Sequence, residues 1–86
     1  MKNRIVVSPM CQYSAKDGSP TIWHHNHLAK LASSGAGMLM IESTAIKKNG
    51  KISHADLCLS NNTQERNFKK LKNYIKKISD IPIGVQ

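Results

Sequence analysis

The amino-acid sequence predicts an α/β fold in which strands and helices alternate in the order strand, helix, strand, helix, strand. Three short apolar runs, at residues 4–8, 38–41 and 83–86, have the length and composition of strands. The two segments between them carry apolar residues at the three- and four-residue spacings of amphipathic helices. Because a helix separates consecutive strands, we expect right-handed crossovers and a parallel sheet.

The first strand is predicted over residues 4–8. Ile5 to Val7 is a β-branched apolar run, and Pro9 favours extended backbone in the residue before it. We expect this strand to be buried. Residues 13–20 are polar and include the turn-forming pair Asp17-Gly18, so they are predicted to form a loop.

A first helix is predicted to follow Thr21, which can serve as its N-cap, and to stop at Gly35 and Gly37. Its expected inward face consists of His24, His27, Leu28, Leu31 and Ala32. His25 is expected to be exposed, and Trp23, Met38 and Met40 are expected to lie in the core. Residues 38–41 lack polar alternation, which indicates a strand buried on both faces.

The second half of the chain predicts a turn at Asn49-Gly50, irregular backbone over residues 52–59, and a second helix. Thr63 is its candidate N-cap, with Glu65 in the first turn. Phe68, Leu71, Ile75 and Ile78 recur at helical intervals, whereas the lysines point elsewhere. Pro82 ends this segment and is tolerated at the first position of the strand predicted at residues 83–86.

The composition is that of an ordinary globular protein, with 40% hydrophobic and 21% charged residues in 86. The formal charge of +8 raises the alternative of a small basic nucleic-acid-binding module that uses the Lys69 to Lys77 face. That face lacks interleaved stacking aromatics, which favours a solvated helix surface instead.

Cysteine and histidine content argues against a disulfide framework and against a metal site. Cys11 and Cys58 are too few for such a framework, and no leader-like segment follows Met1, so we expect a cytoplasmic protein. Cys58 is expected to be a packing residue. The three histidines between Trp23 and Leu28 have no carboxylate or thiolate placed to complete a tetrahedral set. The longest apolar run is far short of the ~20 residues that span a bilayer.

Candidate chemistry lies where the predicted strands end. Parallel α/β folds bind ligands outside the carboxyl ends of their strands, and here these are residues 8–13, residues 42–45 and Gln86. They offer main-chain amides, a thiol, hydroxyls and a carboxamide, which suit a flat ligand rich in amide and carbonyl groups. Glu42 alone is weak support for a general base, and a structural role is at least as plausible for it. Three strands cannot close a sheet, so we expect the chain to be a fragment.

Five motifs, in the same order along the chain, resemble the Old Yellow Enzyme family, in the bacterial branch with Cys in the first flavin loop. They are Lys2 to Tyr13, Trp23-His24-x-x-His27, Gly35-Ala36-Gly37 with Glu42-Ser43-Thr44-Ala45, Gly50-Lys51-Ile52, and Ile83-Gly84-Val85-Gln86. The resemblance implies that residues 1–86 are the N-terminal part of a single FMN-binding TIM (β/α)8 barrel, truncated after its first β/α units. Another phosphate-binding barrel that shares only these opening units stays open as a further alternative.

The resemblance also implies site residues. Ser8, Pro9, Met10 and Cys11 would wrap FMN, with Cys11 tuning its reduction potential, and Tyr13 would contact the substrate. The main chain at Ser43 and the Gln86 amide would meet the pyrimidine part of the flavin.

The implied activity is reduction of the C=C bond of enone-type substrates, with NAD(P)H as the reductant. The complete protein is expected to be a homo-oligomer with no nucleic-acid or membrane partner. The catalytic His or Asn pair and Tyr of the family are expected beyond Gln86, so residues 1–86 alone should be inactive and should bind FMN weakly or not at all.

Overall fold

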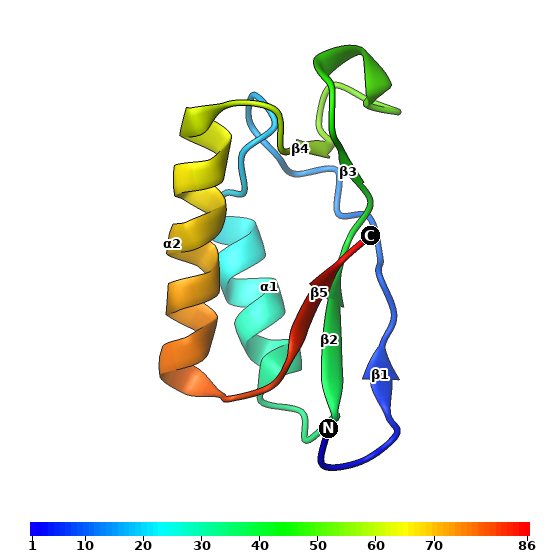
Figure 1. Ribbon diagram of the computed structural model, residues 1–86, viewed down its shortest axis with the longest axis vertical. Helices are drawn as coiled ribbons and strands as arrows, with labels where there is room; N and C mark the ends of the chain where they lie inside the picture. The colour runs from blue at the N-terminus through cyan, green and yellow to red at the C-terminus, as the bar shows by residue number, and fades with distance from the viewer.

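The computed structural model describes residues 1–86, and it shows a three-stranded parallel sheet with two helices on one side (Figure 1). The strands β1 (Val6–Val7), β2 (Met38–Ile41) and β5 (Ile83–Val85) lie in the order β1-β2-β5. The helices α1 (Ile22–Ala32) and α2 (Asn62–Ile78) lie side by side. The predicted strand-helix-strand-helix-strand order and the parallel pairing are therefore confirmed.

The central strand β2 sets the register of the sheet. Val6 of β1 pairs with Met38, and Ile83 and Val85 of β5 pair with Leu39 and Ile41. Because all three strands run in the same direction, their carboxyl ends reach the same edge of the sheet.

The hydrophobic core lies between this sheet and the two helices. Alternate residues of β2, Leu39 and Ile41, point into it because successive side chains of a strand face opposite sides. The other buried apolar residues come from both helices and the connecting segments, namely Leu28, Ala32, Ala36, Leu57, Leu71, Ile75 and Ile81. The second strand is thus buried on its helix face only, and Met38 and Met40 on its other face are half-buried, so the prediction of burial on both faces was wrong.

The first strand is shorter and more exposed than predicted. Only Val6–Val7 is a strand, and Ile5 and Val6 are 64% and 45% exposed. The reason is position: β1 is an edge strand that pairs with β2 alone, and both helices pack closer to β2 and β5 (Figure 1). A β-branched apolar run indicates a strand but does not indicate how many neighbours cover it.

On α1, His24, Leu28 and Ala32 are buried as predicted, and His27 and Leu31 are half-buried. Trp23 is 53% exposed, so its assignment to the core was wrong. It lies on a different face of the helix, where its ring stacks on His27.

His25 is half-buried against Tyr74 of α2, with the two rings tilted, and not exposed as predicted. Neither α1 nor α2 is long and apolar enough to cross a membrane.

The second helix begins two residues earlier than predicted. Asn61 is the N-cap, and its side chain accepts a hydrogen bond from the Gln64 N–H at 2.8 Å, whereas Thr63 lies within the first turn. Leu71 and Ile75 are fully buried, but Ile78 in the last turn is 46% exposed.

Two turns and one strand pair complete the fold. Asp17 and Gly18 both have positive φ between the bridged residues Lys16 and Ser19, which is the backbone of a tight two-residue turn and confirms the predicted loop. Residues predicted to be irregular include β4 (Leu57–Cys58), which pairs in parallel with β3 (Thr44–Ala45). A 3₁₀ turn, η1 (Lys48–Gly50), lies between them, and Cys58 is buried as predicted.

Candidate functional site

The carboxyl ends of the three sheet strands define a rim at one edge of the molecule. The strand β1 leads into the loop of residues 8–13, β2 leads into Glu42 and Ser43, and β5 ends at Gln86. Figure 1 shows Gln86, the C-terminus, beside the segment that joins β2 to β3. The sequence predicted that these three stretches would meet.

Main-chain hydrogen bonds fix two of these stretches against each other. The Gln86 N–H donates to the Ile41 carbonyl at 3.2 Å, and the Thr44 N–H donates to the Gln86 carbonyl at 2.9 Å. Ser43 lies between these two bonded positions, so its main chain is a direct neighbour of Gln86. The Gln86 side chain is exposed and makes no hydrogen bond within the chain.

The loop of residues 8–13 is joined to the same rim through Gln12. Its N–H donates to the Glu42 carboxylate at 3.3 Å, and its side-chain amide donates to the Met10 carbonyl at 2.8 Å. Cys11, which precedes Gln12, is a half-buried free thiol. The Cys11 loop, Ser43 and Gln86 therefore share one edge of the fold.

Several main-chain N–H groups at this rim have no hydrogen-bond acceptor within the chain. Those of Met10, Cys11 and Ser43 donate no hydrogen bond within the chain, although most main-chain groups elsewhere are paired in helices, strands or turns. Free N–H groups on adjacent loops suit a ligand that presents carbonyl oxygens and ring nitrogens.

Tyr13 stands at the outer end of this loop. Its side chain is 60% exposed, and its φ of 51° lies in the left-handed region. Non-glycine residues seldom adopt this conformation, and such residues cluster at ligand-binding sites. The exposed Tyr13 side chain is therefore open to contact with a ligand at the rim.

A buried pair, Glu42 and His24, lies behind the rim. Glu42 is 3% exposed and His24 is fully buried, and His24 Nε2 lies 3.2 Å from Glu42 Oε1. Sequence reasoning left Glu42 without a partner because the two residues are eighteen positions apart and meet only through the packing of α1 on β2. The sequence indicated only that His24 lies on the inward face of the first helix and that Glu42 follows the second strand.

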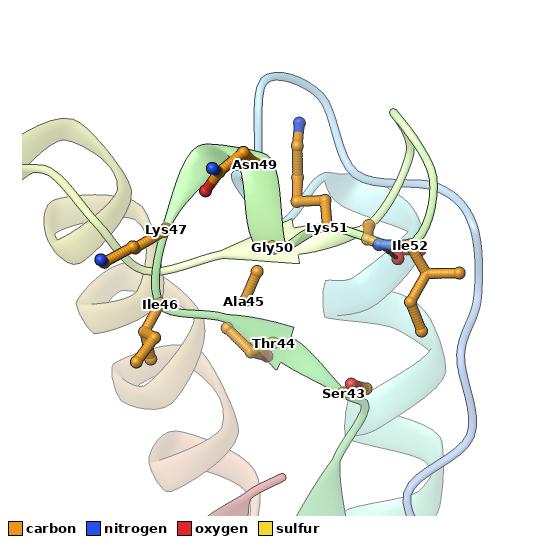
Figure 2. Close-up of a pocket in the computed structure, with 10 residues that line it drawn as sticks. Ser43, Thr44, Ala45, Ile46, Lys47, Asn49, Gly50, Lys51 and Ile52 are labelled. Carbon is orange, nitrogen blue, oxygen red and sulfur yellow. Dashed lines mark hydrogen bonds between the residues drawn. The ribbon is translucent and has the colours of Figure 1, made fainter.

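A pocket of about 370 Å³ adjoins the rim, beyond Ser43 (Figure 2). Its lining comes from the β2–β4 connection, namely residues 43–47, 49–52 and Asp56. Lys47 and Lys51 stand at its margin, with their ammonium groups directed outward (Figure 2). The mouth of this pocket is therefore basic and lies next to the predicted ligand edge.

Asp56 holds the wall of this pocket. Burial tends to raise the pKa of its carboxyl, but hydrogen bonds from the Ser53 N–H and hydroxyl and from the Ile52 N–H, together with the nearby Lys51 ammonium, leave the pKa below its usual value. The carboxylate thus closes a tight turn ahead of β4.

The basic face of α2 is solvated. Its lysines are exposed, and Lys69 forms an exposed ion pair with Glu65 at 3.2 Å. Lys76 instead donates to the Ile81 carbonyl at 2.8 Å, which joins α2 to the segment before β5. Nowhere in the chain do three or more His, Cys, Asp or Glu side chains gather as a metal-binding group would require.

Comparison with known proteins identifies relatives over the whole chain. The model of the NADH:flavin oxidoreductase / NADH oxidase family matches residues 1–86. An NADH:flavin oxidoreductase of Gibberella zeae is 38% identical over 84 residues, which cover 98% of this chain and 20% of that protein. An NADPH dehydrogenase of Listeria monocytogenes is 47% identical over 73 residues, which cover 83% of this chain and 22% of that protein. The chain thus spans about a fifth of the length of these curated relatives.

A solved structure shares the fold. Morphinone reductase, a TIM barrel, superposes with a TM-score of 0.84 at 19% identity, over 98% of this chain and 22% of its own. The predicted fold class, the first β/α units of a (β/α)8 barrel, is therefore confirmed.

Proposed function

The chain belongs to the NADH:flavin oxidoreductase / NADH oxidase family, and on that premise we propose that the complete protein is an FMN-dependent ene-reductase. It would take hydride from NAD(P)H and reduce the C=C bond of α,β-unsaturated carbonyl compounds. One observation carries the proposal: the Cys11 loop, Ser43 and Gln86 meet at the carboxyl edge of a parallel sheet. This edge is where barrels of this kind hold their ligands.

The residues at this edge fit an isoalloxazine ring. The free N–H groups of Met10, Cys11 and Ser43 can donate to its carbonyl oxygens and ring nitrogens, and the exposed Gln86 carboxamide can both donate and accept. FMN, when bound, would supply the redox chemistry, accepting hydride from NAD(P)H and delivering it to the β-carbon of the alkene.

The residues of this chain would orient the flavin and adjust its electronics. The Cys11 thiol, in the same loop as the free N–H groups, would hydrogen-bond the polar edge of the ring, which would change the relative stability of its oxidised and reduced forms. Tyr13 would border the substrate. The groups that polarise the substrate carbonyl and return the proton are expected in the rest of the complete protein.

The experiment is a spectroscopic and kinetic test of the complete protein. We expect a yellow protein that releases FMN on denaturation, is bleached by NADH or NADPH without oxygen, and is reoxidised by cyclohexenone. Replacing Cys11 with Ala should shift the flavin reduction potential. Cys58→Ala is the matched control, because it removes the buried thiol of β4, and it should leave the potential unchanged. A complete protein that is colourless and takes up no added flavin would end the proposal.

A further inference from the structure

We propose that Glu42 is a positioning residue that holds the Cys11 loop at the rim. Its effect on the flavin rests on the proposed function, but its effect on the loop does not. Glu42 is a carboxylate with a 2% exposed side chain at the end of β2, and a buried charge persists only where donors compensate for the lost water. Those donors come from two other parts of the chain.

Each carboxylate oxygen has one polar neighbour, a hydrogen-bond donor at Oε2 and an imidazole nitrogen at ion-pair distance from Oε1. Oε2 accepts the Gln12 N–H at 3.3 Å, and Oε1 lies 3.2 Å from His24 Nε2. In addition, the Glu42 carbonyl accepts the Thr44 hydroxyl at 2.9 Å. One residue thereby joins the first loop, α1 and the start of β3.

His24 is itself held so that it faces Glu42. Its Nδ1 accepts the Thr21 N–H at 3.0 Å, as a capping side chain does in the first turn of a helix. Because Nδ1 accepts, the proton of a neutral imidazole lies on Nε2, on the side of Glu42. This nitrogen is buried and makes no hydrogen bond of good geometry, and Glu42 Oε1 at 3.2 Å is its ion-pair neighbour. Removal of either side chain would therefore leave the other one buried without this polar neighbour.

The contact between Glu42 and the Gln12 N–H fixes the main chain next to Cys11 and Tyr13. Gln12 follows Cys11 and precedes Tyr13, whose left-handed φ of 51° needs support from its surroundings. The Gln12 side chain is fixed as well, since its Oε1 accepts the indole N–H of Trp23 at 2.9 Å. With its main chain on Glu42 and its side chain on Trp23, Gln12 sets where the Cys11 thiol lies relative to Ser43.

The test compares Glu42→Gln with Glu65→Gln in the complete protein. Glu65 is exposed on α2 and its carboxylate pairs with Lys69, so its variant makes the same chemical change without removing a contact to Gln12 or His24. A neutral amide cannot receive both donors as strongly, so we expect Glu42→Gln to change the rate at which iodoacetamide alkylates Cys11 by about tenfold. Glu65→Gln should leave this rate unchanged. Equal rates in Glu42→Gln and wild type would overturn the proposal.

A double-mutant cycle on the flavin reduction potential tests whether Glu42 acts through Cys11. Glu42→Gln should shift the potential, and the same substitution in a Cys11→Ala background should shift it much less. Equal shifts in both backgrounds would show that Glu42 does not act through the thiol, and the proposal would fail. If the protein holds no flavin, the proposed function fails while the alkylation rates still decide the role of Glu42.

Amide exchange in the wild-type protein tests the proposal without a substitution, so the result does not depend on whether a variant folds. In the flavin-free complete protein, the Gln12 amide should exchange more slowly than those of Met10 and Cys11, which have no acceptor in the chain. Exchange of Gln12 as fast as its two neighbours would contradict the proposal without any substitution.

Discussion

Gly37 and Gly84 show how single residues constrain this fold in two different ways. A Cβ at Gly37 would strike the main-chain carbonyl oxygen of Asn3, which the hydrogen bonds between the first segment and the 35–37 turn hold in place. A Cβ at Gly84 would strike the sulfur of Met40, at the flexible end of a side chain. The first obstacle is rigid and the second can move.

Gly37→Ala should therefore destabilise the protein more than Gly84→Ala. We expect Gly37→Ala to cost about 1–3 kcal/mol, the usual range for overpacking, and Gly84→Ala to cost less because Met40 can change rotamer. Chemical unfolding of both variants measures the difference. An equal loss in the two variants would show that the contact with Asn3 is not rigid.

Asp56 gives a pH dependence at the residue scale. Since its folded pKa is lowered, its contribution to stability is complete above the unfolded pKa, which is about 3.9, and is lost as the pH falls toward the folded pKa. The hydrogen bonds at stake are those from Ile52 and Ser53.

Acidification should loosen the turn before β4 in the wild type. The amides of Ile52 and Ser53 should lose protection from exchange as the pH falls below about 4, after correction for the intrinsic exchange rate. In Asp56→Asn the turn should already be weaker at neutral pH and should show no such transition. NMR-detected exchange checks both, and protection that is unchanged in acid would refute the assignment to Asp56.

At the scale of elements, α2 shows where a helix begins. Asn61 and Thr63 are both suitable N-cap types, but only Asn61 has the extended backbone of a cap and accepts the Gln64 N–H. Gln64 is itself buried and donates to the Asp17 carbonyl at 3.0 Å, so the first turn of α2 is tied to the Asp17-Gly18 turn. This long-range contact favours the earlier start.

Asn61→Ala should cost about 1 kcal/mol of stability, as expected for loss of an N-cap, and Thr63→Ala should cost less than half of that. Thermal unfolding of the two variants provides the comparison, and Thr63→Ala serves as the matched control. The opposite order would place the cap where the sequence alone suggested.

At the scale of the whole molecule, the sheet is open: both of its lateral edges lack a further strand. Its edge strands β1 and β5 each pair with one neighbour, β2. In barrels of this kind the ligand phosphate is usually held by loops after strands seven and eight, and the chain matches about a fifth of the barrel proteins it resembles.

Residues 1–86 on their own should therefore bind FMN weakly or not at all, whereas the complete protein should bind it tightly. Titration followed by flavin fluorescence tests both. For residues 1–86, quenching of their single tryptophan, Trp23, gives a second signal because its indole N–H donates to Gln12 in the Cys11 loop. Tight binding by residues 1–86 alone would mean that FMN does not need the phosphate-binding loops of the rest of the barrel.

Element order, strand direction and the shared edge of the three strand ends could be read from the amino-acid pattern, because periodicity of 3.6 or 2 and turn residues are local properties of the chain. The same holds for the placement of the Cys11 loop, Ser43 and Gln86 at one rim. Four features could not be read in this way: the exposure of β1, the exposure of Trp23, the cap at Asn61 and the Glu42–His24 pair. Each depends on which segments pack together, and a contact between residues far apart in the chain leaves no mark in the local pattern on either side of it.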